Sequence, residues 1–318
     1  MNRIEPVPVL ALALALGLSL VAACAVDPSA PASGPPKRTS GPEPAARLVV
    51  LAGTVGSMRL LTPGSDGQLE PFGTSPAPAD AAWLSSAAGQ LLVTTLTGRA
   101  LLSAGASGGA WRAGPGDLGR SHPLRAFGML DPAGRRIAFV DGDPGSGEAG
   151  RLVTANLDGG AGPSLHLDRA AESAPAWLPD GRLVVVVRDA FDEPRPVLAD
   201  PGVGSSTSLS SAPLRSIAIS SQAVAIITDG GALEFGSLVD WLAGRALKQI
   251  PSPGATGSAE VLQAQPSGDG LELALVIDDA NGDATAVRIV TPDGGREFAR
   301  LVLPRGANRA IVAWLGAP

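Results

Sequence analysis

From residue 176 the chain reads Ala176-Trp177-Leu178-Pro179-Asp180-Gly181-Arg182-Leu183-Val184-Val185, which is an aromatic residue, a Pro-Asp-Gly turn and then a β-rich run. Variants of this stretch recur along the chain, at Trp83–Val93, Leu130–Phe139, Ile219–Ile226, Ala264–Leu273 and Ala313–Gly316. The body of the protein is therefore built from repeats, and the repeat length identifies the architecture.

The repeats are spaced like the blades of a propeller. If one residue of each stretch is taken as equivalent, the steps are about 40 to 50 residues, which is the length of one blade. The equivalent residues are Trp83, Leu130, Trp177, Ile219, Ala264 and Trp314. Three further strands fit between successive positions, each bounded by Gly, Pro or Asp. In the Leu130 unit they are expected at Arg136–Val140, Arg151–Ala155 and Ser164–Leu167, and in the Ala264 unit at Leu271–Ile277, Ala286–Thr291 and Phe298–Leu303.

The two ends of the repeat region complete one another. Leu48–Ala52, Met58–Thr62 and Leu69–Phe72 supply three strands without a preceding inner strand, whereas Ala310–Leu315 supplies an inner strand with nothing after it. We expect these four strands to share one blade, because closure removes the exposed edges of an open array. The sequence predicts an all-β, six-bladed β-propeller of four-stranded blades, occupying residues 47–318.

The repeats resemble a known family. Asp131–Phe139 and Leu178–Leu183 are similar to the TolB-type, WD40-like repeats of six-bladed propellers. TolB itself is a soluble periplasmic protein that binds partner proteins, so the resemblance implies a binding role in the cell envelope. In layout the chain is similar to lipid-anchored propellers such as the propeller part of LpqB-like lipoproteins, whose second domain has no counterpart here.

The N-terminal segment indicates export. An apolar run of about 15 residues is followed by Val21-Ala22-Ala23-Cys24, which resembles a bacterial lipoprotein signal. That resemblance implies removal of residues 1–23 and lipidation of Cys24, the single cysteine of the chain. Residues 24–46 are rich in Pro, Ser and Ala and are expected to be a disordered tether. The protein would then be held on the extracytoplasmic side of the membrane; an uncleaved N-terminal anchor helix is the alternative.

The composition of the chain limits the classes of molecule that it is expected to bind. The net charge is −6, and an acidic chain argues against binding to nucleic acid. One cysteine cannot form an internal disulfide. We expect a monomer that binds an envelope protein.

Few residues suggest catalysis. His122 and His166 are the two histidines, too few for a His-based triad or a multi-histidine metal site at unrelated positions. Gly105–Gly109 matches the spelling of a nucleophile elbow but falls in a Gly/Ser turn between strands. We therefore expect no enzyme activity, cofactor or metal. Six-bladed propellers also include hydrolases, lyases and lactonases, so an enzyme is the first alternative. A module for carbohydrates or envelope polymers is the second, although the chain has no tyrosine.

An aspartate follows the second strand in four of the repeats, namely Asp141, Asp189, Asp229 and Asp278. These loops share one face of a propeller, so the carboxylates would form part of an acidic ring. Further acids would reinforce it, namely Asp143, Glu148, Asp192, Glu193, Asp279 and Asp283. Two interpretations stay open: a binding face for a cationic partner, or Asp serving as an ordinary turn residue. Residues 279–283 lack the Gly and Glu of an EF-hand calcium loop.

The tryptophans have a packing explanation. Trp83, Trp177 and Trp314 occupy the same place in the repeat and are expected to wedge between neighbouring blades. Trp111 and Trp241 lie elsewhere, Trp111 on an expected outer strand. Each is either partly buried against a blade or exposed as an anchor for a partner.

Overall fold

Continuous apolar runs form the second strand of each sheet, and they explain how the sheets pack. In β13 (Leu183–Arg188), Leu183, Val185 and Val187 pack toward one neighbouring sheet, whereas Val184 and Val186 pack toward the other. Successive side chains of a strand point to opposite faces, so a run without polar residues has both faces buried. Each sheet is therefore covered on both sides by its neighbours.

The computed structural model describes residues 47–73, 76–97, 99–104, 111–117, 127–141, 149–158, 160–209, 212–251, 260–278, 284–293 and 296–316. The signal segment, Cys24 and the tether expected for residues 24–46 lie outside these ranges. Among the described residues, no helix has the length and apolar character needed to cross a membrane.

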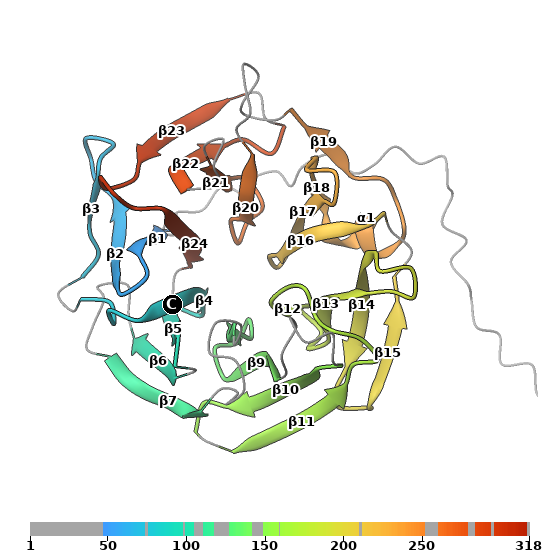
Figure 1. Cartoon of the computed structure of the whole chain (residues 1–318). Coiled ribbons are helices and arrows are strands. Elements are labelled where there is room, and N and C mark those ends of the chain that lie inside the picture. The colour runs from blue at the N-terminus through green and yellow to red at the C-terminus, as the bar shows by residue number, and fades with distance from the viewer. Residues whose placement is uncertain are drawn as a thin grey trace, which may run out of the picture. The chain divides into compact units, whose positions relative to one another are not determined.

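The strands form six antiparallel sheets, the blades, arranged in a ring (Figure 1). From the centre outward, blade 1 contains β24 (Arg309–Leu315), β1 (Arg47–Thr54), β2 (Ser57–Pro63) and β3 (Leu69–Pro71). Blade 2 contains β4 (Ala81–Ala87), β5 (Gln90–Thr95), β6 (Arg99–Ala104) and β7 (Trp111–Asp117). Blade 3 contains β8 (Met129–Leu130), β9 (Arg136–Asp141), β10 (Arg151–Asn156) and β11 (Ala161–His166).

Blade 4 contains β12 (Ala176–Trp177), β13, β14 (Pro194–Asp200) and β15 (Ser205–Ser208). Blade 5 contains β16 (Leu214–Ile219), β17 (Ala223–Thr228), β18 (Leu233–Ser237) and β19 (Lys248–Ile250). Blade 6 contains β20 (Val261–Pro266), β21 (Leu273–Asp278), β22 (Ala284–Val290) and β23 (Glu297–Val302). The predicted six-bladed β-propeller is confirmed.

The ring closes as predicted, through the C-terminal strand. β24 pairs with β1 along its whole length, from Arg47 opposite Leu315 to Gly53 opposite Arg309. Gln263 of blade 6 strengthens the closure with its side-chain amide: its Oε1 accepts from the backbone N–H of Val312 at 3.0 Å, and its Nε2 donates to the Val312 carbonyl at 3.2 Å. The side chain thus bonds to the inner strand of blade 1 almost as a neighbouring strand would.

Each seam between blades holds one apolar cluster, so the core is divided into six parts. Blade 1 shows the division: Val50 and Ala52 pack against blade 6, whereas Val49 and Leu51 pack against blade 2. The other seams hold the clusters of blades 2 and 3, 3 and 4, 4 and 5, and 5 and 6.

The predicted tryptophan wedges are confirmed. The Nε1 of Trp83 in blade 2 donates to the sulfur of Met129 in blade 3 at 3.2 Å. Trp177 in blade 4 donates to the Met129 carbonyl at 2.9 Å, and Trp314 in blade 1 donates to the Gln265 carbonyl in blade 6 at 2.9 Å. Each indole therefore packs in a seam while its N–H bonds to the inner strand of the adjacent blade.

Blade 5 contains a helix, although the sequence predicted only strands and turns. A short helix, α1 (Leu238–Leu242), follows β18, and the Ser237 hydroxyl caps it by accepting from the Asp240 N–H at 3.4 Å. The helix buries Trp241 in the seam between blades 4 and 5, so this tryptophan is not an exposed anchor.

In blade 6, β21 begins two residues later than predicted, because Ser267 and Asp269 accept the N–H groups of Glu272 and Leu271 and hold them in the turn.

Strand direction gives the propeller two different faces. We call the face with the turns between first and second strands the turn face, and the opposite face the aspartate face. Asp141, Asp189, Asp229 and Asp278 all lie at the aspartate face, after or at the end of the second strand of blades 3 to 6. β1 begins, and β24 ends, at the turn face.

Candidate functional site

A channel runs along the axis of the propeller, between the inner strands of the six blades. It encloses a cavity of about 450 Å³. Its lining consists mainly of Ala, Ser, Ile, Pro and Gln side chains together with the tryptophan wedges. The side chains of the wall are therefore mostly small and uncharged, and they offer hydroxyl and amide groups for hydrogen bonding.

Two ionisable side chains line the described part of the channel, and both are in ion pairs. Glu172 accepts from Nε of Arg188 at 2.9 Å. Arg215 pairs with Glu260 and also donates to the Val261 carbonyl at 2.9 Å. Glu172 precedes β12 and Arg215 is the second residue of β16, so both pairs lie at the mouth on the aspartate face. No sequence pattern indicates this role, because each residue acquires it only when the blades close into a ring.

The four predicted aspartates share the aspartate face but have different surroundings. Asp141 is paired with Arg151 at 3.2 Å, at the ends of adjacent strands of its own blade. Asp278 is buried and accepts from the backbone N–H of Glu260. Asp229 is exposed, in the turn after β17. Turn and strand-end contacts thus engage Asp141 and Asp278, whereas Asp229 presents its carboxylate to solvent.

Asp189 organises the turn between β13 and β14. Its Oδ1 accepts from the backbone N–H groups of Phe191 at 2.7 Å and Glu193 at 3.0 Å. Its own N–H donates to the Glu193 carbonyl at 2.8 Å. Desolvation alone would raise the pKa of Asp189, but these backbone donors and then Arg195 outweigh it and lower the pKa below its ordinary value. The carboxylate therefore stays charged and holds the turn.

Of the acids predicted to reinforce the ring, two are described. Asp192 has a side chain 82% exposed and an ion pair to Arg188 at 3.1 Å. Glu193 pairs with Arg195. Asp143, Glu148, Asp279 and Asp283 lie outside the described residues, as does the calcium-like stretch 279–283.

The residues considered for catalysis or metal binding do not converge in the described structure. His166 is exposed on the outermost strand of blade 3, far from the channel wall in strand order. His122 and Gly105–Gly109 lie outside the described residues. Within the ranges the structure covers, no three His, Cys, Asp or Glu side chains gather to hold a metal ion. Trp111 lies on outer strand β7, partly buried, and donates to the Pro76 carbonyl at 3.0 Å.

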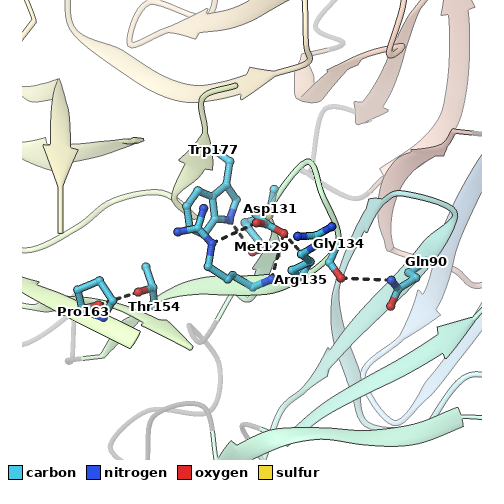
Figure 2. A network of polar contacts seen from close by, with 9 residues as sticks. Gln90, Met129, Asp131, Gly134, Arg135, Thr154, Pro163 and Trp177 are labelled. Carbon is cyan, nitrogen blue, oxygen red and sulfur yellow. Dashed lines mark hydrogen bonds and ion pairs between the residues drawn. The ribbon is translucent and has the colours of Figure 1, made fainter. Parts of the chain in front are cut away.

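Asp131 in the turn of blade 3 joins a polar network that the sequence did not reveal. Figure 2 shows its carboxylate bonded to the backbone of Arg135, with Gln90 and Trp177 on either side. Gln90 of blade 2 donates to the Gly134 carbonyl at 3.2 Å, and the guanidinium of Arg136 lies 4.7 Å from the ring centre of Trp177 in blade 4. This turn therefore links three blades at the turn face.

No protein-family model and no curated protein matches the sequence. Solved structures with a similar fold include TolB from Acinetobacter baumannii, at 14% identity and a TM-score of 0.60 over 85% of this chain and 66% of that one, which is slightly less than two thirds of its length. A putative TolB from Agrobacterium tumefaciens has 14% identity and a TM-score of 0.56, over 85% of this chain and 99% of that one. A puromycin hydrolase has 16% identity and a TM-score of 0.51, over 82% of this chain and 53% of that one. The resemblance to TolB-type propellers is thus confirmed at the level of the fold.

Proposed function

We propose that this chain is a lipid-anchored, extracytoplasmic propeller that binds a protein of the cell envelope through its aspartate face. The supporting observation is the separation of the two faces. The described chain starts and ends at the turn face, at Arg47 and Gly316, so a tether preceding Arg47 joins the propeller there. The aspartate face lies at the opposite end of every blade and is free to meet a partner.

The channel supports binding rather than acid–base catalysis. A general acid or base needs an ionisable group free to exchange a proton with the substrate. Both ionisable groups in the described lining, Glu172 and Arg215, are held in ion pairs. The fold does not decide between the two classes, since propellers similar to this one include TolB and a puromycin hydrolase.

The charge of the aspartate face supports a partner with a basic surface. Asp192 and Asp229 are both exposed there, and Asp192 meets a single exposed arginine. Complementary charge accelerates encounter and selects among partners, even where each surface charge contributes little affinity.

Crosslinking of the tagged, full-length chain in its own membranes tests the proposal. Asp192→Asn with Asp229→Asn should reduce capture of the envelope partner severalfold, because both changes remove exposed charge from the aspartate face. Asn also tolerates the left-handed conformation of Asp192, whose φ is 64°. The matched control is Asp66→Asn with Asp158→Asn, two exposed acids in turns of the turn face.

Equal capture by both double variants would contradict the assignment of the face, and no captured protein in any sample would contradict the binding role. A Cys24→Ser chain, fractionated in the same experiment, should leave the membrane fraction. Its retention there would contradict the lipid anchor.

A further inference from the structure

Phe191 stands out on the aspartate face. It is 85% exposed, the largest exposure of any large apolar side chain in the described chain. It occupies the tip of the turn between β13 and β14 in blade 4. Single exposed apolar residues are common on protein surfaces, so exposure alone assigns no role. A role for Phe191 follows from two further features: the order of the turn that holds it and the charges around it.

The turn fixes Phe191 before any partner arrives. Asp189 accepts two backbone N–H groups across the turn, including that of Phe191 itself. Arg188 donates to the Asp192 carbonyl at 3.0 Å on one side of the tip, and Arg195 pairs with Glu193 on the other. Because the backbone is already ordered, little conformational entropy is lost when the tip binds. An aromatic ring displayed in this way is typical of an interface anchor.

The surroundings of the ring define the chemistry of its partner. Asp192 and Glu193 follow Phe191 directly, and both carboxylates reach solvent. With Asp189, Asp192 and Glu193 against Arg188 and Arg195, the tip keeps a net negative charge. The anionic headgroups of a membrane surface repel such a tip, which favours a protein with basic side chains. Arg188 also connects the tip to Glu172 at the channel mouth, so a partner seated on Phe191 would lie beside that mouth.

We propose that Phe191 inserts into an apolar pocket of the envelope partner, and that Lys or Arg side chains of the partner border this pocket. The inference rests on the proposed function, because it names the anchor through which the aspartate face binds. The contact centres on blade 4, and the aromatic ring contributes more affinity than the carboxylates around it.

Val203 provides a matched control within the same blade. It is 77% exposed at the tip of the turn between β14 and β15, on the turn face. Truncation of either side chain removes exposed apolar surface from an ordered turn, so neither change should alter folding. Phe191→Ala and Val203→Ala therefore differ chiefly in the face that they affect.

The test uses the full-length chain in its own membranes. A photo-crosslinking amino acid is placed at position 191 or 203, and the crosslinked peptides are sequenced. We expect position 191 to label a protein segment rich in apolar and basic residues, and position 203 not to label it. Capture by chemical crosslinking should fall about tenfold or more in Phe191→Ala and stay unchanged in Val203→Ala. Higher salt should weaken capture by the wild-type chain.

The outcomes separate this inference from the proposed function. If the aspartate-face variants lose a partner that Phe191→Ala retains, the face binds but the anchor is wrong. Labelling of lipid or of a second copy of this chain from position 191 would overturn the inference as well. If the wild-type chain captures no protein, both the inference and the binding role are wrong.

Discussion

The turns of blades 3 and 4 use the same residue types in a different order, and their aspartates have opposite environments. In Leu130-Asp131-Pro132-Ala133-Gly134-Arg135-Arg136 the acid precedes the proline and is 4% exposed. In Leu178-Pro179-Asp180-Gly181-Arg182 it follows the proline, and its side chain is 49% exposed.

The contacts of the two carboxylates differ accordingly. Asp131 accepts from the N–H groups of Arg135 at 2.6 Å and Arg136 at 3.0 Å, and from the Arg136 guanidinium at 3.1 Å. Asp180 bonds with Arg182, two residues away, through its N–H at 3.0 Å and its guanidinium at 2.6 Å. The position of the acid relative to the proline thus decides whether it supports the fold or is a solvated turn residue.

The largest test of this comparison is Asp131→Ala. The change removes a buried carboxylate that accepts from two backbone N–H groups and from the Arg136 guanidinium, so we expect the free energy of unfolding to fall by about 3 kcal/mol. Asp131→Asn keeps one acceptor oxygen and should lose about half as much. Urea unfolding followed by tryptophan fluorescence measures both. A loss below about 1 kcal/mol for Asp131→Ala would show that the network is dispensable.

The glycines of the two turns give a second, smaller contrast. Gly134 and Gly181 both have left-handed backbones, with φ of 64° and 89°, so alanine costs about 1 kcal/mol at either position. At Gly134 the added Cβ would also lie 3.0 Å from Ala88 and from the Gln90 amide of blade 2, whereas at Gly181 the nearest atom is 3.4 Å away, on Arg136. We expect Gly134→Ala to lose about 2 kcal/mol and Gly181→Ala about 1 kcal/mol in urea unfolding. Equal losses for the two variants would show that Ala88 and Gln90 of blade 2 do not crowd a side chain at position 134.

The smallest expected effect is that of Asp180→Ala. The hydrogen bond from the Arg182 side chain lowers the pKa of Asp180 below its ordinary value of 3.8. The stabilisation is therefore present above that value and is lost as the pH falls through the lowered pKa. Solvent screens this exposed pair, so we expect a loss of about 0.5 kcal/mol or less at pH 7, and no difference from wild type once Asp180 is protonated. Urea midpoints across the acid range check this, and a loss comparable to that of Asp131→Ala would show that the exposed Asp180 supports the fold as strongly as the buried Asp131.

The repeat pattern made most of the fold predictable. The recurring turn residues and apolar runs located the inner strands at Trp83, Trp177 and Trp314. The packing of these strands depends on local sequence pattern and is the same in each of these blades. Helix α1 was missed, since Leu238–Leu242 is too short to show helical periodicity.

The candidate site was less predictable. The sequence placed Asp141, Asp189, Asp229 and Asp278 on one face, yet their burial depends on contacts made across strands and blades. Asp278 is buried, and its carboxylate accepts from the N–H of Glu260, which lies 18 residues earlier in the chain. Phe191 could have been noticed as an aromatic in an acidic turn, but its exposure could not, because exposure depends on the absence of covering segments.

The pairing of β24 with β1 also sets the order in which the propeller can fold. β1 is the first strand of the domain to be synthesised, and β24, the strand that covers its edge, is the last. Contacts so far apart in sequence form slowly, because the loop between them must be closed first. Until Arg309–Leu315 is made, Val49 and Leu51 belong to an open strand edge of the kind that pairs with other chains. An incomplete chain thus exposes an unpaired strand edge that can pair with other chains, and the final strand covers it.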